Sequence, residues 1–142
     1  MTETANQTAP KTPGIVIFVA ILNFISAAAF LGLSVLWAVA LIFGNVIGVY
    51  DAVTQRISQF YQSPNYALGF NFVFVILLFI CLVFVAFFFW EGLGLLKRNK
   101  IAWYVQIALS VIGLMGVPIG TILNAIILIF FFQPSVREHF KV

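Results

Sequence analysis

The sequence predicts an all-α integral membrane protein: a bundle of four transmembrane helices with cytoplasmic N and C termini and a tight C-terminal helical hairpin. Of the 142 residues, 63% are hydrophobic and only 8% are charged, whereas soluble domains carry about 25% charged residues. Charges are also absent from three long stretches, each longer than the roughly 20 apolar residues that a helix needs to cross a bilayer. These stretches lie between Lys11 and Asp51, between Arg56 and Glu91, and between Lys100 and Arg137.

The first span is predicted over about residues 14–43. Thr12-Pro13 is a favourable helix start, because a hydroxyl cap precedes a proline that needs no amide donor at the first helical position. Apolar sequence continues to Tyr50, and one helix of that length would measure about 55 Å, more than a bilayer core of about 30 Å. The helix therefore either projects outward or bends near Gly44 and Gly48.

Residues 51–69 form the largest polar segment between the predicted spans. Apolar residues recur there at helical spacing among polar ones, which predicts a short amphipathic helix on the outer membrane surface that ends at Pro64. The second span follows over about residues 70–91 and contains almost no hydrogen-bonding side chain. The apolar residues of the amphipathic segment are Val53, Ile57, Phe60 and Tyr61.

Residues 101–132 are compatible with one long helix kinked at Pro118 or with two short helices that reverse there. Charge separates these alternatives, because basic residues concentrate on the cytoplasmic side. Four spans place six basic residues on one side and Arg56 alone on the other, whereas three spans divide them four against three. The sequence therefore predicts a hairpin. Its arms, about 25 and 21 Å long as helices, either thin the bilayer or form a re-entrant pair.

The predicted organisation is a polar tail followed by one membrane domain. The cytoplasmic tail comprises residues 1–13, and the membrane domain comprises residues 14–142. Within this domain the expected spans are about 14–43, 70–91, 101–117 and 119–132, with the outer amphipathic loop at 51–69.

Small and polar side chains recur on one face of three predicted helices. Such residues let membrane helices approach closely and hydrogen-bond to each other, so we interpret them as helix-packing residues. A polar ligand site between Asn23, Gln106 and Asn124 is the alternative. The candidate packing residues are Asn23, Ser26, Ser34, Gln106, Ser110, Thr121 and Asn124.

The residues around the basic segment 97–100 are typical of a membrane interface. Tryptophans gather at headgroup level, and Glu91 is expected there as a partner of a neighbouring cation. An acidic residue inside a span would instead indicate proton or ion handling, but the other predicted spans hold no charged partner for it. The predicted interfacial anchor comprises Trp90, Glu91, Lys97, Arg98, Lys100 and Trp103.

The chain lacks the residue sets that catalysis and cofactor binding require. Its only histidine, His139, lies in the C-terminal tail, so no histidine within a span is available to ligate haem. No cluster of cysteines or carboxylates predicts a metal site, and no glycine-rich phosphate loop or paired nucleophile and base is found. We expect no enzymatic activity, no cofactor and no metal. The net charge of +3 is attributed to cytoplasmic basic residues and not to nucleic-acid binding.

Several short motifs gather within about residues 90–142. They are Gly92-x-Gly94, Lys97-Arg98-Asn99-Lys100, Trp103, Pro118-Ile119-Gly120-Thr121 and Pro134-Ser135-Val136-Arg137-x-x-Phe140. In these motifs the chain resembles small four-helix prokaryotic membrane proteins of unknown function. The resemblance implies a pair of helical hairpins and a bacterial inner-membrane location, and it implies no activity. The loop at 51–69 is not part of the shared pattern.

The expected function is that of a non-catalytic multi-pass membrane protein. It would serve as a structural or accessory subunit of a larger membrane complex, or form a homo-oligomer, in a bacterial or archaeal cytoplasmic membrane. Its expected partners are membrane lipids and other membrane-protein subunits or further copies of itself. The alternative is a small channel, a transporter or a protein that binds a lipophilic ligand.

Overall fold

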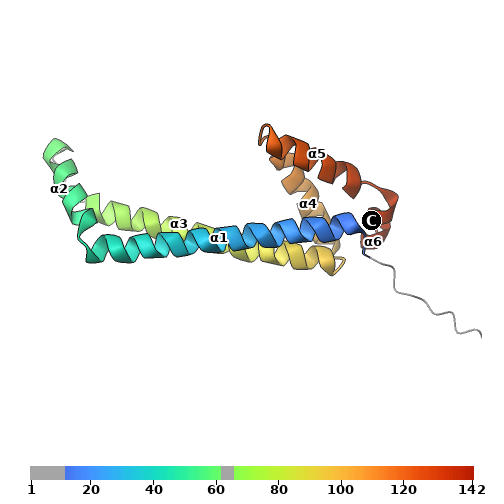
Figure 1. Cartoon of the computed structure of the whole chain (residues 1–142), viewed down its shortest axis with the longest axis horizontal. Coiled ribbons are helices and arrows are strands. Elements are labelled where there is room, and N and C mark those ends of the chain that lie inside the picture. Colours follow the sequence, from blue (N-terminus) through green and yellow to red (C-terminus); the bar gives the residue numbers. More distant parts are fainter. Residues whose placement is uncertain (1–11, 62–65) are drawn as a thin grey trace, which may run out of the picture. The chain divides into compact units, whose positions relative to one another are not determined.

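The computed structural model describes residues 12–61 and 66–142, and every regular element in these ranges is a helix. The all-α prediction is thus confirmed. Most of the predicted tail and the predicted helix end at Pro64 lie outside the described residues. The helices are α1 (Gly14–Val46), α2 (Val49–Tyr61), α3 (Tyr66–Leu96), α4 (Lys100–Gly113), α5 (Ile119–Phe131) and α6 (Pro134–Phe140) (Figure 1).

Two helices in the described chain are long and apolar enough to cross a membrane. They are α1, with 33 residues, and the Asn71–Leu96 part of α3, with 26 residues. Helices α5 and α6 meet the same criterion only as a pair bent by 72°, which would make a third, broken span. Helix α4 is apolar, but its 14 residues span only about 21 Å. These helices indicate a membrane protein with two or three candidate spans.

The structure divides the chain into two compact units. The central unit is Ile25–Phe88, and the terminal unit combines the residues up to Phe24 with Phe89–Val142. Helices α1 and α3 therefore each contribute to both units, whereas α2 belongs to the central unit and α4, α5 and α6 belong to the terminal one.

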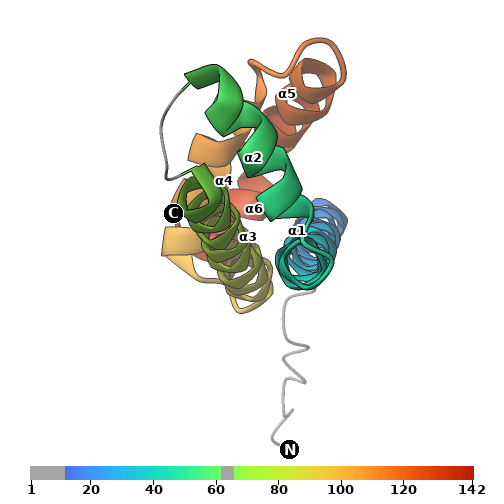
Figure 2. The same ribbon diagram turned by 90° about the vertical axis from the view of Figure 1, so that its left-hand side faces the viewer.

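In the central unit, aromatic side chains pack α1 against α3. The ring of Phe30 stacks on those of Phe84 and Phe88, with centroid distances of 5.0 and 5.7 Å. Near the α2 end, Asn45 and Asn71 exchange two side-chain hydrogen bonds of 3.1 Å. Figure 2 shows the two helices side by side in this unit. The uniformly apolar sequence thus pairs its helices through ring contacts and one amide pair.

The break between α1 and α2 occurs at Gly48. Its φ of +72° lies in the left-handed region that glycine enters without a steric penalty. Tyr50 then folds back, and its hydroxyl donates a 2.8 Å hydrogen bond to the carbonyl of Ala40. The tyrosine ring packs directly on Gly44, where a Cβ atom would overlap it. Of the two predicted bend positions, Gly48 therefore makes the turn and Gly44 permits the close contact.

The basic segment after α3 forms a tight turn into α4. Arg98 adopts a left-handed conformation with φ of +59°. Asn99 follows in an extended conformation, and its side-chain oxygen accepts a 2.9 Å hydrogen bond from the amide of Ile101. This is the N-cap geometry for which asparagine is favoured.

Helices α4 and α5 form an antiparallel hairpin in the terminal unit. The indole Nε1 of Trp103, near the start of α4, donates a 3.3 Å hydrogen bond to the carbonyl of Phe131 at the end of α5. At the turn, the hydroxyl of Thr121 donates a 2.7 Å hydrogen bond to the carbonyl of Leu114. Residues 101–132 therefore fold as two helices rather than one long kinked helix.

Helix α6 is an element that the sequence analysis does not predict. It begins at Pro134, whose missing amide donor costs nothing at the first helical position, and it buries Val136 and Phe140. These two residues lie one turn apart and face the core of the terminal unit. That core consists of Val16, Val19, Ala20, Leu95, Ala102, Trp103, Ile127, Phe131, Val136 and Phe140.

Candidate functional site

A chain of buried polar side chains connects α1 to α4 inside the terminal unit. The Nδ2 of Asn23 donates a 2.9 Å hydrogen bond to the Oε1 of Gln106, and the Nε2 of Gln106 donates a 3.3 Å hydrogen bond to the hydroxyl of Ser110. All three residues are buried, with exposed fractions of 6%, 5% and 0%. Helical spacing makes this possible, because Gln106 and Ser110 lie one turn apart on α4.

Asn124 does not share these hydrogen bonds. Its Nδ2 donates a 2.8 Å hydrogen bond to the carbonyl of Gly120. The side chain packs on Gly113 of α4, where it would overlap any Cβ atom. Asn124 thus belongs to the α4–α5 contact. The residues of the alternative ligand site, Asn23, Gln106 and Asn124, are not joined by a common set of hydrogen bonds.

The two predicted packing serines of α1 lie in the central unit. Ser34 is buried, and its hydroxyl donates a 2.7 Å hydrogen bond to the carbonyl of Leu31 in its own helix. Ser26 is half-buried. Neither belongs to the same unit as the Asn23–Gln106 pair.

Glu91 lies in the interior of the terminal unit. It is completely buried, and neither carboxylate oxygen has a hydrogen-bond partner among the described residues. The structure thus shows no hydrogen bond from Lys97, Arg98 or Lys100 to this carboxylate, and the position of Glu91 at headgroup level stays a prediction. Gly94 lies three residues later on the same face of α3. This face packs against α4 so closely that a Cβ atom on Gly94 would come within 2.8 Å of the methyl group of Ala102.

The other predicted anchor residues divide into exposed and buried ones. Trp90, Lys97 and Lys100 are exposed and Arg98 is half-buried, and their place at a membrane interface stays a prediction. Trp103 instead lies in the core with only 6% of its surface exposed. Its hydrogen bond to Phe131 occupies the indole N–H that an interfacial tryptophan would offer to headgroups or water.

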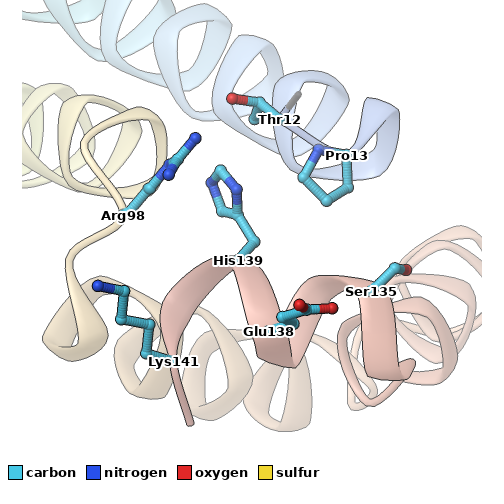
Figure 3. A pocket seen from close by; sticks show the side chains of 7 residues that line it. All are labelled: Thr12, Pro13, Arg98, Ser135, Glu138, His139 and Lys141. Atoms are coloured by element: carbon cyan, nitrogen blue, oxygen red, sulfur yellow. The ribbon is translucent and has the colours of Figure 1, made fainter. Parts of the chain in front are cut away.

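A cavity of about 660 Å³ lies in the terminal unit between the start of α1, the α3–α4 turn and α6. Figure 3 shows the imidazole of His139 extending from α6 toward Arg98 and the residues that precede α1. The sequence does not reveal this site, because His139 follows the last predicted span. The apolar pair Val136 and Phe140 behind Pro134 is the signal that would have indicated a helix there. The lining residues are Thr12, Pro13, Arg98, Ser135, Glu138, His139 and Lys141.

The electrostatic environment of this cavity is positive near His139. Burial, followed by the charge of Arg98, lowers the pKa of His139 below its ordinary value. The residue is only 7% exposed, and neither ring nitrogen has a hydrogen-bond partner among the described residues. In its neutral form the imidazole presents one N–H donor and one lone pair.

No three His, Cys, Asp or Glu side chains of the described chain come together as a metal-binding group. The geometry instead offers two kinds of polar environment in the terminal unit. One is the internally bonded Asn23–Gln106–Ser110 chain, and the other is the open cavity beside His139. Comparison with protein-family models, with curated proteins and with solved structures finds no match to this chain.

Proposed function

We propose that this chain is a non-catalytic multi-pass protein of a bacterial or archaeal cytoplasmic membrane. Its role would be that of a structural or accessory subunit in a larger membrane complex or in a homo-oligomer. The observation that carries this proposal is the Asn23–Gln106–Ser110 chain, whose polar groups bond to one another across α1 and α4. Polar groups used in this way hold helices together.

The lateral surface of the central unit supports the same proposal. Large apolar side chains of α1 and α3 are widely exposed there, among them Phe43, Phe72 and Phe79 with exposed fractions of 57%, 67% and 66%. Such a surface is stable only against lipid chains or other apolar helices. Membrane lipids and the helices of partner subunits, or of further copies, are therefore the proposed contacts.

We further propose four membrane crossings, with α4 and α5 as the last two and both termini in the cytoplasm. The support is the distribution of basic residues, since only Arg56 would then lie on the outer side. The short α4–α5 hairpin would cross a locally thinned bilayer or enter it from the cytoplasmic side and return. Both versions return α6 to the side of the basic segment.

Cysteine labelling tests this topology. In a Cys81→Ala background, single cysteines are introduced by Lys97→Cys, Gln133→Cys and Ala52→Cys at exposed positions. A membrane-impermeant maleimide added to intact cells should label only the Ala52→Cys variant, and inverted vesicles should show the opposite pattern. Labelling of Gln133→Cys together with Ala52→Cys would instead demonstrate three crossings and overturn the proposed topology.

Purification tests the accessory role. The tagged full chain, extracted in a mild detergent from its native membrane, should migrate as a complex with a fixed stoichiometry of other membrane subunits or of itself. Native mass spectrometry measures that stoichiometry. A monomer that retains a small lipophilic molecule would contradict the accessory role and support the alternative.

The alternative is a small channel, transporter or lipophilic-ligand binder, and Glu91 favours it. Ionisable residues buried within membrane helices mark ion or proton pathways, and Glu91 is fully buried without a hydrogen-bond partner among the described residues. Proton flux into liposomes that contain the purified chain discriminates, with Glu91→Gln as the matched variant. Flux that disappears in Glu91→Gln, with unchanged assembly, would establish the alternative.

A further inference from the structure

The cavity beside His139 has the size and walls of a small-ligand site. Its volume of about 660 Å³ falls within the range of about 300–1,000 Å³ that is typical of such sites. Three segments that are far apart in the sequence form it: the residues before α1, the α3–α4 turn and α6. The cavity therefore exists only in the folded terminal unit.

His139 is the feature that indicates a ligand. The residue is only 7% exposed, yet both ring nitrogens lack a hydrogen-bond partner among the described residues. Buried polar atoms are rarely left in this state, because an unmade hydrogen bond costs more than a made one contributes. Since the imidazole lines the cavity (Figure 3), a bound molecule would supply the missing partner.

The charges and donors around the imidazole define the chemistry of that molecule. Arg98 and Lys141 bring two basic side chains to the wall, and the hydroxyls of Thr12 and Ser135 add donors. Glu138 is the one acidic group among the described lining residues. We propose that this cavity binds a phosphate group, carried by a lipid headgroup or by a soluble phosphate compound.

A phosphate fits these residues better than a cation or a neutral molecule does. Guanidinium and ammonium groups are the usual partners of phosphate oxygens, and one carboxylate is too few for a dedicated metal site. A phosphate beside Arg98 would also offset the repulsion that disfavours protonation of His139. Imidazolium carries an N–H on each ring nitrogen, so the nitrogen that faces the phosphate would donate to it.

This assignment does not depend on the proposed accessory role or on the number of membrane crossings. It requires only the terminal unit, in which all lining residues lie. A structural subunit and a transporter are equally compatible with such a site. Failure of the phosphate experiment would therefore leave the proposed function untouched, and the reverse also holds.

The test uses the single histidine of the chain as a probe. The full chain, labelled with 13C-histidine and purified in dodecyl maltoside without phosphate, gives one set of imidazole signals because His139 is the only histidine. At pH 7.5 it is titrated with inorganic phosphate in one arm and with dihexanoyl phosphatidylglycerol in the other. The expected result is a saturable shift of the His139 signals and, in the complex, a higher pKa of this imidazole.

Variants that keep His139 identify the binding residues. Arg98→Gln should weaken the binding about tenfold or more, because it removes a charge-assisted hydrogen bond. Lys97→Gln is the matched control, since Lys97 is adjacent in sequence but does not line the cavity, and it should change the affinity less than about twofold. Glu138→Gln should strengthen the binding several-fold by removing the acidic lining group.

Each outcome has a defined meaning. Saturation by the lipid alone assigns the site to a headgroup, and saturation by inorganic phosphate assigns it to a soluble phosphate compound. Absence of a saturable shift in both arms would overturn the proposal. Equal binding by the wild-type chain and by Arg98→Gln, while both retain the same helical circular-dichroism spectrum, would overturn it as well.

Discussion

The side-chain amide of Asn23 donates a 2.9 Å hydrogen bond to the side-chain carbonyl oxygen of Gln106, across 83 positions of sequence. The bond joins α1 to α4, and the Nε2 of Gln106 donates a further hydrogen bond to the hydroxyl of Ser110. Both side chains are buried away from water, so each supplies the hydrogen-bond partner that water would otherwise supply to the other. The terminal unit is therefore held together by a polar contact as well as by its apolar core.

Asn23→Ala should destabilise the protein by about 0.5–2 kcal/mol, because it leaves Gln106 without its buried donor. In a double-mutant cycle with Gln106→Ala, the two effects should be non-additive by about 0.6–1.7 kcal/mol. Reversible unfolding in mixed micelles measures both quantities. Ser34→Ala serves as the control, since its hydroxyl bonds within its own helix. Additive losses from Asn23 and Gln106 would show that the bond does not couple the helices.

Gly113→Ala should destabilise the α4–α5 hairpin by about 1–3 kcal/mol, because the new methyl group would overlap the side chain of Asn124. Adding Asn124→Ala should recover most of this loss by making room. Gly32→Ala is the matched control, since no atom lies within 4 Å of its Cβ position, and alanine there should stabilise α1 by up to about 1 kcal/mol. Equal effects at the two glycines would contradict the close packing of α4 on α5.

Glu91→Gln should stabilise the protein by about 1 kcal/mol or more, because an amide is easier to bury than a carboxylate that lacks a hydrogen-bond partner among the described residues. The thermal midpoint of the detergent-solubilised chain measures the change. Glu138→Gln, on an exposed carboxyl of α6, should leave the midpoint nearly unchanged. A marked loss of stability in Glu91→Gln would mean that the ionised carboxylate is needed in the fold.

Acidification from pH 7.5 to pH 5.5 should destabilise the terminal unit through His139. Its pKa is lower in the folded chain than in the unfolded one, because of burial and then Arg98. Between the two pKa values the unfolded chain binds more protons, so the free energy of unfolding rises with pH in that window and falls as the pH drops below about 6.5. The neighbouring charged groups are Arg98 on the α3–α4 turn, Glu138 on α6 and Lys141 directly after α6.

His139 can change the free energy of unfolding by at most about 1.4 kcal/mol per pH unit. Comparison with His139→Gln isolates it, because every other titrating group is common to both chains. The variant should lose this part of the pH dependence. A wild-type chain whose stability rises on acidification relative to His139→Gln would show that the imidazole is stabilised in its protonated form.

Much of the helical organisation follows from local features of the sequence. Gly48 has no side chain to oppose a left-handed turn, Asn99 caps α4 through its own side chain, and Pro118 lies where α4 and α5 reverse. Helix α6 is missed because its seven residues are short and highly charged. Only the apolar pair Val136 and Phe140 indicates that it packs on the rest of the chain.

The candidate site is less predictable than the helices. Asn23 and Gln106 are recognisable as packing residues, yet nothing in their helices indicates that they bond to each other and that Asn124 packs on Gly113 instead. The cavity beside His139 is formed by three segments that meet only in the folded chain. A pattern within one segment of the sequence does not indicate which distant segments lie beside it in the folded chain.

The sequence by itself determined the all-helical class and the long apolar helices, and it favoured the reversal at Pro118. These depend on charge, length and backbone preference, which act within one segment. Only the tertiary structure decided that Glu91 points inward, that Trp103 belongs to the core and that His139 lines a cavity. Helix α3 is apolar on every side, so its periodicity does not distinguish a lipid-facing from a buried face. The buried face of α3 is the one that the neighbouring helices cover.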